Sequence, residues 1–440
     1  MRAPAQEALL PKRPSHSCCS LRTLRICVCD FAYLLIRMAI WLIGHLLGYR
    51  DYEPEPGTVV LCCHTNGMGH VIQMLRIFEV LSTAKIKVDL VVLADQSKIP
   101  EHFLIALREK AGPKCEIVDL QHEVHYDDNN GGGINNLSVV MEAVWKIFGP
   151  DGWRTTKQCT QLLMRHRPEV CLSLWDPHLP LMVDSLGART HVVQVATQAI
   201  MYEHGRGHDL VLDMLYLLNV SRRGELLPLL FSPQPGAMPI VCEVPPLLPS
   251  EPYLVAYSCM PQVLTPLQKI KTHKILLFAK NVDKWARFYA DCPNVHVHPV
   301  GSSFKQTLAK SSGLIASPSP GAVIQALGCA KPCYLFIPPG HLEQICNYQY
   351  YTKHFIGVHS PETSDIVQWA DGALSPSDTQ LMLSQAYRVR DWLNLFDDVA
   401  QRTLVRSLKR QHQHGEQPWP PAAFPPPGGV SGRMYTTSPV

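Results

Sequence analysis

The sequence lacks an excess of charge of either sign. Its 440 residues include 40 basic and 37 acidic side chains, which gives a formal net charge of +3. So small a balance provides no bulk attraction to phosphate backbones, and nucleic acid is therefore not expected as a partner. Hydrophobic residues make up 46% of the chain. This excludes disorder for most of the chain, because it holds enough apolar surface to build cores, and the length fits about two or three domains.

Two metal signatures are also missing. The chain has no Asp-x-Asp sequence and no pair of Cys-x-x-Cys units at zinc-like spacing. Several of its fifteen cysteines, such as Cys62, Cys63 and Cys333, stand inside apolar, strand-like runs, where a reduced thiol acts as a small hydrophobe. The pattern predicts no metal and no cofactor, and it favours reduced thiols in a cytosol-facing catalytic domain.

Residues 1–50 are predicted to form a basic N-terminus followed by a membrane-associated helix. The apolar stretch 26–47 is long enough for a bilayer, which takes about 20 residues. Three polar residues interrupt it at spacings that share one helix face: Asp30, Arg37 and His45. A single polar stripe favours a helix that lies in the membrane interface. A membrane-spanning anchor and a buried first helix of the catalytic domain stay open as alternatives.

From residue 57 onward, apolar strands alternate with helices in two successive series. This alternation predicts an α/β fold in which two Rossmann-like, doubly wound domains face each other across a cleft. The predicted segments are an N-terminal domain at 57–232, a Pro-rich linker at 233–252, a C-terminal domain at 253–358, C-terminal helices at 359–411 and a disordered tail at 412–440. Ligands of such sheets bind beyond the carboxyl ends of the strands, so the site is expected between the two domains.

The first motif, His64-Thr-Asn-Gly-Met-Gly-His70, lies between a predicted strand and a predicted helix. Gly67 and Gly69 allow the backbone to approach a ligand closely, and the helix N-terminus offers unpaired amides. The dinucleotide-binding fingerprint is incomplete because its third glycine position is Ile72, which disfavours a nicotinamide or flavin enzyme. His70 is suited to contact an acceptor hydroxyl or a phosphate; simple helix capping is the alternative.

Two further motifs follow predicted strands in the second half. In Ser317-Pro-Ser-Pro-Gly321, a small-residue turn enters a helix, and Ser319 and Gly321 are placed to cradle a phosphate. In the segment 338–344, Glu343 and Gln344 open the next helix, where N-terminal capping is the plainer reading.

The order of these motifs resembles that of the GT-B glycosyltransferases. Gly-x-Gly-His, Ser-Pro-Ser-Pro-Gly, Gly-x-Ala-Lys-Pro and Glu-Gln with a downstream Asn347 are similar to the group of the bacterial enzyme that adds N-acetylglucosamine to lipid-linked muramyl precursors, and to its archaeal and eukaryotic relatives. The resemblance covers 57–358 and is strongest at 313–358. It implies a nucleoside diphosphate sugar, such as a UDP-sugar, in the C-terminal half. It also implies an acceptor, lipid or membrane-bound, in the N-terminal half.

The resemblance also implies roles for single residues. His70 would be the general base of an inverting, metal-independent hexosyl transfer, and Asp176 would orient it or hold the acceptor. The donor would be held by Gly67, Gly69, Ser258, Ser319, Gly321, Gln325, Glu343 and Gln344.

Two other functions stay open, and a departure from the family pattern motivates the first of them. Gln325 stands where the family has a glutamate that grips the nucleotide ribose, and an amide binds hydroxyls without charge assistance. A catalytically reduced subunit that binds a nucleotide sugar is therefore one alternative. The other is a nucleotide-sugar epimerase on the same fold, which His122, Glu123 and His125 would serve with acid and base groups.

Overall fold

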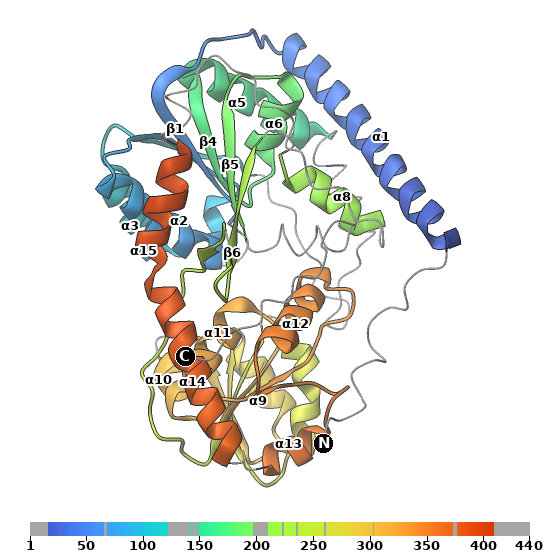
Figure 1. Ribbon diagram of the computed structural model, residues 1–440, viewed down its shortest axis with the longest axis vertical. Coiled ribbons are helices and arrows are strands. Elements are labelled where there is room, and N and C mark those ends of the chain that lie inside the picture. Colours follow the sequence, from blue (N-terminus) through green and yellow to red (C-terminus); the bar gives the residue numbers. More distant parts are fainter. Residues whose placement is uncertain are drawn as a thin grey trace, which may run out of the picture.

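The computed structural model describes residues 16–65, 68–121, 142, 145, 149–196, 210–221, 224–234, 236–258, 261–301, 303–372 and 376–408. Their strands form two parallel sheets, one in each half of the chain. Figure 1 shows the N-terminal half above and the C-terminal half below, each with helices packed around its sheet. The prediction of an α/β chain with two Rossmann-like domains is therefore confirmed.

The N-terminal sheet has the strand order β3-β2-β1-β4-β5-β6-β7. Its strands are β1 (Glu55–Cys63), β2 (Val88–Leu93), β3 (Glu116–Asp119), β4 (Pro168–Leu174), β5 (His191–Ala196), β6 (Glu225–Leu230) and β7 (Met238–Pro239). In the centre of the sheet, Val60 lies opposite Leu90 on one side and Cys171 on the other. Both faces of β4 and of the second half of β1 are covered, which explains why β4 is mostly apolar and β1 is apolar from Val59 to Cys63.

Helices cover this sheet on both faces. They are α2 (Met68–Thr83), the 3₁₀ turn η1 (Gln96–Lys98), α3 (Glu101–Ala111), α5 (Pro150–His166), α6 (His178–Leu186) and α8 (Leu210–Asn219). The apolar residues of α2 and α3 join the core on one face, and those of α5, α6 and α8 join the core on the other. Helix α2 begins at Met68, so Gly69 and His70 lie in its first turn.

The C-terminal sheet repeats the topology, with the order β10-β9-β8-β11-β12-β13. Its strands are β8 (Tyr253–Tyr257), β9 (Lys274–Ala279), β10 (Val295–Pro299), β11 (Gly313–Ala316), β12 (Cys333–Leu335) and β13 (Val358–His359). Its helices are η2 (Pro261–Lys269), α9 (Val282–Phe288), α10 (Ser303–Lys310), α11 (Pro320–Gly328), α12 (Leu342–His354) and α13 (Ile366–Asp371). In each sheet the first strand of its series lies near the centre, and the order reverses beside it, which is where such sheets bind ligands.

The chain crosses between the domains twice. Strand β7 lies inside the predicted linker 233–252, so the N-terminal sheet ends at Pro239 and the connection runs from there to β8. Helix α14 (Pro376–Asn394) packs on α11 of the C-terminal domain. Helix α15 (Phe396–Ala400) and the π-helical turn η3 (Gln401–Val405) then return to the N-terminal domain, as Figure 1 shows.

Two side-chain contacts fix this return. Arg76 of α2 forms an ion pair with Asp397 of α15, and the Gln401 amide donates a 3.2 Å hydrogen bond to the carbonyl of Val80. Apolar residues of α14, α15 and η3 also share one core with both sheets. The last described helices therefore belong to both domains rather than to a separate unit.

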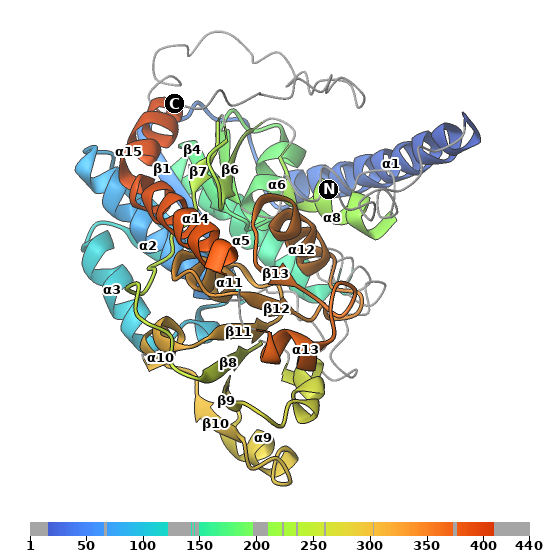
Figure 2. The ribbon, with the colours of Figure 1, turned by 60° about the horizontal axis from the view of Figure 1, so that its bottom comes forward.

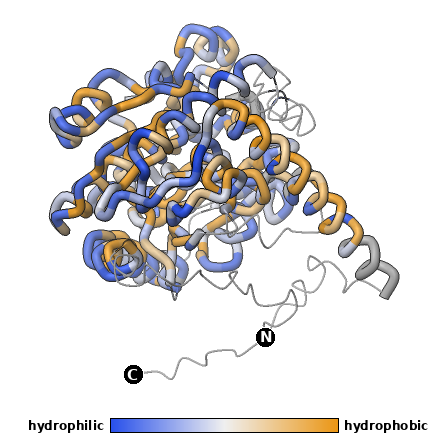
Figure 3. Tube along the Cα trace, turned by 90° about the horizontal axis from the view of Figure 1, so that it is seen from above, coloured by the Kyte–Doolittle hydropathy of each residue, from blue (hydrophilic) through white to orange (hydrophobic). Residues whose placement is uncertain are grey.

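Helix α1 (His16–Leu46) begins ten residues before the predicted stretch 26–47. One of its faces packs on α5, α6 and α8 through Cys29, Tyr33, Ile36 and Ile40. The rest of the helix projects from the body in Figure 2, and Figure 3 shows it to be apolar over most of its length. By length and composition, the segment Thr23–Leu46 suffices to cross a membrane, although part of that segment is buried in the protein.

The described cysteines form no disulfide bond. The Sγ atoms of Cys62 and Cys171, on the adjacent strands β1 and β4, lie 3.7 Å apart in the core. Burial, followed by the contact with Cys171, raises the pKa of the Cys62 thiol, so the thiol stays protonated and packs as a hydrophobic group. The N-terminal segment 1–15 and the predicted disordered tail lie outside the described residues.

Candidate functional site

Four polar residues gather at the carboxyl ends of β1 and β4. His64 directly follows β1, and its backbone N–H donates to the carbonyl of Leu174 at the end of β4 (3.2 Å). His70 lies in the first turn of α2, while Asp176 and His178 lie where β4 passes into α6. The topology thus brings two strand ends and two helix N-termini to one edge of the sheet.

Asp176 is fully buried and holds His178. Its Oδ1 accepts hydrogen bonds from the backbone N–H of His178 (2.7 Å) and from the ring Nδ1 (3.0 Å). Burial raises the pKa of Asp176, but the charge and hydrogen bonds of His178 outweigh burial, and the net shift is downward. Asp176 is therefore ionised, and its Oδ2 is buried without a donor. Asp176 was predicted to orient His70 or to hold the acceptor; the side chain that it binds in the structure is His178.

His64 and His70 form an edge-to-face contact, with their ring centroids 5.8 Å apart. Burial, together with the neighbouring His64, lowers the pKa of His70 to about 3. Burial also lowers the pKa of His64 to about 4, a shift that the charge of Asp176 partly offsets. Both rings are thus neutral near pH 7. The Nδ1 atom of His70 is buried without a partner, so this ring has a nitrogen that no group of the protein uses.

On the C-terminal sheet, the corresponding edge carries a serine cluster. Ser258 follows β8 and donates a 3.0 Å hydrogen bond to the hydroxyl of Ser317, which follows β11. Ser319 occupies the N-cap position of α11 but makes no capping hydrogen bond, and its Oγ is buried without a partner. A helix N-terminus with an unused hydroxyl beside it is suited to an anion.

The start of α12 adds more unused groups to this edge. Oε1 of Gln344 and Oδ1 of Asn347 are both buried without partners. The amide nitrogen of Asn347 donates to the carbonyl of Pro318 (3.1 Å), which ties α12 to the loop before α11. Glu343 lies half-buried in the same first turn. Burial lowers the pKa of His341, at the N-cap position, to about 4, so a neutral imidazole borders this group.

Gly69 and Gly321 occupy equivalent positions in the two domains. Each is the second residue of its helix, α2 or α11. Neither has a positive φ, and a Cβ atom at either position would meet no atom within 4 Å. Neither the backbone nor the packing therefore requires glycine there. Both glycines leave the amides of a helix N-terminus uncovered, as close approach of a ligand requires.

Gln325, the predicted ribose contact, is bound elsewhere. Its amide nitrogen donates a 3.2 Å hydrogen bond to the carbonyl of Glu243 in the interdomain connection, and the Glu243 carboxylate pairs with Lys305. Gln325 therefore anchors the connection to α11. Its contact with a nucleotide stays a prediction.

Several predicted residues lie outside the described part of the chain: Gly67, His122, Glu123 and His125. Within the described ranges, no group of three or more His, Cys, Asp or Glu is arranged to hold a metal ion. The sequence reasoning assigned no role to His64, His178 or His341. The sequence did contain an indication for all three histidines, because each follows the carboxyl end of a strand within a few residues.

No family model matches the chain, and no curated protein matches its sequence. Solved structures do match its fold. The spinosyn forosaminyltransferase SpnP is 11% identical over 80% of this chain and 99% of its own, with a TM-score of 0.51. The glycosyltransferase SnogD from Streptomyces nogalater is 15% identical over 81% of this chain and 100% of its own, with a TM-score of 0.49.

The chain has the GT-B fold. Identities this low show the architecture alone, so the finer resemblance to the muramyl-precursor group stays a prediction.

Proposed function

We propose that this protein is a glycosyltransferase that moves a hexose from a nucleoside diphosphate sugar to an acceptor hydroxyl. The observation that carries the proposal is the set of buried polar atoms without partners at the two sheet edges. On the N-terminal edge these are His70 Nδ1 and Asp176 Oδ2; on the C-terminal edge they are Ser319 Oγ, Gln344 Oε1 and Asn347 Oδ1. Native proteins leave few such atoms unpaired, and a polar ligand between the domains would satisfy them. The match to a forosaminyltransferase of the same fold supports the proposal.

The donor fits the C-terminal edge. Its diphosphate would lie at the N-terminus of α11, against Ser319 and the uncovered amides beside Gly321, with Ser258 nearby. The first turn of α12 would offer Glu343 and Gln344 to the sugar hydroxyls. The positive ends of the helix dipoles would stabilise the departing diphosphate, which is the charge that metal-independent transfer must balance.

The acceptor fits the N-terminal edge, where His70 serves as the general base. The neutral ring takes the proton of the acceptor hydroxyl while that oxygen attacks the anomeric carbon. The bond from this carbon to the diphosphate oxygen breaks, and the diphosphate leaves with the electron pair. Attack on the face opposite the leaving group inverts the anomeric configuration. The Asp176–His178 pair is the second basic group within this edge.

A panel of nucleotide sugars tests the function. We expect a nucleoside diphosphate to raise the melting temperature of the protein. When the corresponding nucleotide sugar is incubated with hydroxyl acceptors, we expect free nucleoside diphosphate and a glycosylated product, both detected by mass spectrometry. The hydrogen bond between Gln325 and Glu243 favours one alternative function, a subunit that binds the donor without transferring its sugar. Binding with no product across the panel would establish that alternative, and a free epimerised sugar would establish an epimerase. If no nucleotide binds, the proposal fails.

Replacing Gly321 with alanine is expected to weaken donor binding about 10- to 100-fold without destabilising the fold. A methyl group there meets no protein atom, and alanine favours a helix by about 0.5–1 kcal/mol over glycine. The methyl group would instead intrude on the diphosphate and cost one charge-assisted hydrogen bond, worth about 1.5–3 kcal/mol. Calorimetric titration with the nucleoside diphosphate measures the loss.

Gly301 provides the matched control, since a Cβ atom there also meets nothing within 4 Å. G301A should change neither the affinity nor the melting temperature. Unchanged affinity in G321A would show that the diphosphate does not lie at this helix.

We further propose that the protein associates with a membrane through α1 and acts on a lipid or membrane-bound acceptor. The face of α1 opposite the protein core carries large apolar side chains whose exposed fractions run from 48% to 70%: Leu24, Val28, Phe31, Leu34, Leu35, Met38, Trp41, Leu42 and Leu46. An apolar surface of this extent marks an interaction site. Because the N-terminal domain covers the other face, a docked α1 lies along the membrane surface rather than across it.

Replacing Phe31, Leu35 and Leu42 together with serine is expected to abolish flotation with phosphatidylcholine vesicles. These side chains are at least half exposed and are not part of the hydrophobic core, so the melting temperature should change little. The triple variant is cleaner than deletion of residues 1–50, which would also uncover the core beneath Tyr33 and Ile40.

The matched control replaces three apolar residues that are equally exposed elsewhere: Ile105, Leu381 and Tyr387. The control should float as the unchanged protein does. Flotation of the α1 variant would contradict the proposal, and resistance of the unchanged protein to alkaline extraction would indicate a spanning helix instead.

A further inference from the structure

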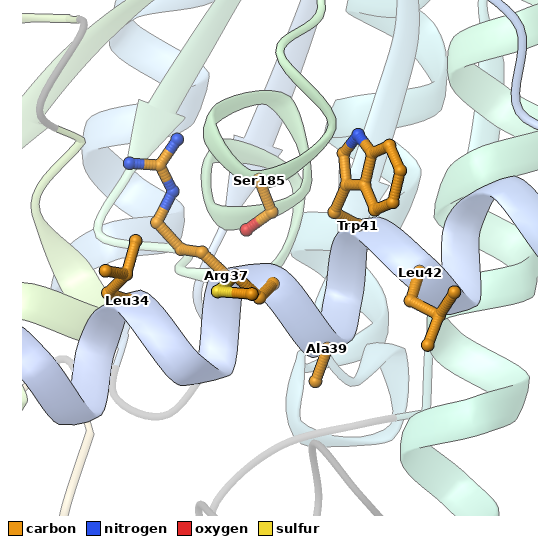
Figure 4. Close-up of a pocket in the computed structure, with 7 residues that line it drawn as sticks. Leu34, Arg37, Ala39, Trp41, Leu42 and Ser185 are labelled. Carbon is orange, nitrogen blue, oxygen red and sulfur yellow. The ribbon is translucent and has the colours of Figure 1, made fainter.

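A pocket of about 490 Å³ opens where α1 crosses α6, on the same side as the exposed apolar face. Figure 4 shows the side chains that line it, all but one of which come from α1. The lining residues are Leu34, Arg37, Met38, Ala39, Trp41, Leu42 and Ser185. The pocket lies away from the two sheet edges that form the candidate site.

The pocket contains a cation without a counter-ion. Among the described residues, no carboxylate lies within ion-pair distance of Arg37. Its Nη2 donates to the backbone carbonyl of Asp184, and its Cζ lies 5.8 Å from the centre of the Tyr33 ring. Nε is buried without an acceptor. Most of the five N–H donors of this guanidinium are therefore unused by the protein, so an anion with several oxygens suits it.

Ser185 adds a second unused polar group. It is 6% exposed, and its Oγ is buried without a hydrogen-bond partner. In Figure 4 it lies between Arg37 and Trp41, at the side of the pocket that α6 forms. A hydroxyl and a guanidinium on the two sides of one pocket are the donors that phosphate oxygens require.

The rim of the pocket is apolar. Leu34, Met38 and Leu42 are 50%, 58% and 54% exposed, and Trp41 stands beside them. Tryptophan favours the depth of lipid headgroups, and an arginine can extend its charge to that depth while its stem stays in apolar surroundings. A cation enclosed by such a rim matches a molecule with a charged head and hydrocarbon chains. A soluble anion would gain nothing from this rim.

We propose that this pocket binds the phosphate of an anionic phospholipid while α1 lies in the membrane surface. The inference rests on the proposed attachment through α1 and is independent of the proposed sugar transfer. Helix α6 connects the pocket to the candidate site, since Ser185 and His178 lie seven residues apart, or roughly 10 Å along a helix. A lipid held at one end of α6 thus fixes the rotation and height of the Asp176–His178 pair above the bilayer.

The test compares binding to vesicles of phosphatidylcholine alone with binding to vesicles that also contain phosphatidylglycerol. The full-length protein is expected to favour the anionic vesicles. Arg37→Gln should reduce that preference about fivefold, the effect of one basic residue near a charged surface. Ala39→Phe keeps every charge but fills the pocket, so it should reduce the preference as well. Both variants should keep their affinity for phosphatidylcholine vesicles, and their melting temperatures show whether they fold.

The exposed Arg50, which lies outside the pocket, provides the matched control for charge. An equal loss in Arg50→Gln and Arg37→Gln would show that diffuse charge, and not the pocket, draws the protein to anionic lipid. An unchanged preference in Ala39→Phe would likewise overturn the proposal. Stabilisation of the protein by inorganic phosphate without vesicles, lost in Arg37→Gln, would show that the pocket binds a soluble anion and would overturn the proposal. A dimer in solution that Ala39→Phe dissociates would show that a second copy of the chain occupies the pocket, and would also overturn it. If the protein binds neither kind of vesicle, the proposed attachment through α1 is wrong. Sugar transfer to a soluble acceptor would then still test the proposed function of the candidate site.

Discussion

Replacing His70 with alanine is expected to lower the rate of sugar transfer by about 10²–10⁴-fold, the usual contribution of a general base. Its ring is neutral above pH 4, and its Nδ1 is committed to no group of the protein. Donor binding should change little, because the proposed donor contacts lie on α11 and α12. The turnover rate at saturating donor and the thermal shift with a nucleoside diphosphate measure the two effects separately.

Substitutions at the neighbouring pair decide between two bases. If His70 is the base, His178→Gln should lower turnover less than His70→Ala does, because His178 then only borders the acceptor. The larger loss in His178→Gln would move the role to the Asp176–His178 pair. Equal activity in His70→Ala and the unchanged protein would remove His70 altogether. Since burial lowers the pKa of His70 to about 3, the acidic limb of kcat/KM for the free enzyme should also fall well below pH 6.5.

The two sheets were predictable because their central strands contain apolar runs that are visible in the sequence. The segment Val59–Cys63 of β1 is a continuous apolar run, and β4 is mostly apolar, as strands buried on both faces must be. Two elements contain a proline, which weakens the local signal for a strand or a helix. Pro228 stands inside β6, and Pro180 occupies the first turn of α6. A first-turn proline costs nothing, because the amide that it removes has no partner within the helix.

The candidate site was predictable in position but not in its partners. Strand-end motifs located His70, Ser319 and Gln344 correctly at the carboxyl edges of the sheets. That Gln325 donates to Glu243 depends on how the interdomain connection packs against α11, 82 residues away along the chain. No local pattern records such a contact. The pairing of Asp176 with His178 is local, because the two residues stand two positions apart in the segment Asp176-Pro177-His178, and it was therefore predictable from the sequence.

Helix α1 shows why composition alone left its role open. Its sequence is apolar on two opposite sides, with Asp30 and Arg37 on the border between them. A buried helix and a membrane helix both explain such a composition. In the structure, one side of α1 packs into the core through Tyr33 and Ile40, and the other side is exposed. The interpretation as a buried helix therefore explains one face, and the interpretation as a membrane helix explains the other.

Acid is expected to destabilise this protein strongly between pH 6.5 and pH 4. Burial holds the pKa of His64, His191 and His341 near 4 and that of His70 near 3, whereas an unfolded histidine titrates near 6.5. The unfolded state therefore binds more protons in this window, and stability that is complete above pH 6.5 is lost as the pH falls. Each group costs about 2 kcal/mol at pH 5, and the four together cost on the order of 8 kcal/mol, within the usual total stability of 5–15 kcal/mol.

His191 at the start of β5 isolates this effect, since it lies outside the candidate site. His191→Gln should flatten the fall in melting temperature between pH 7.5 and pH 5 by roughly 4–8 °C. The exposed His296, replaced in the same way, provides the control and should leave the curve unchanged. Equal slopes in all three proteins would mean that His191 titrates as an unfolded histidine does. A nucleoside diphosphate should protect against acid, because its negative charge beside α12 favours the protonated form of His341. His191→Gln should retain this protection, which would separate the acid sensitivity of the site from that of the core.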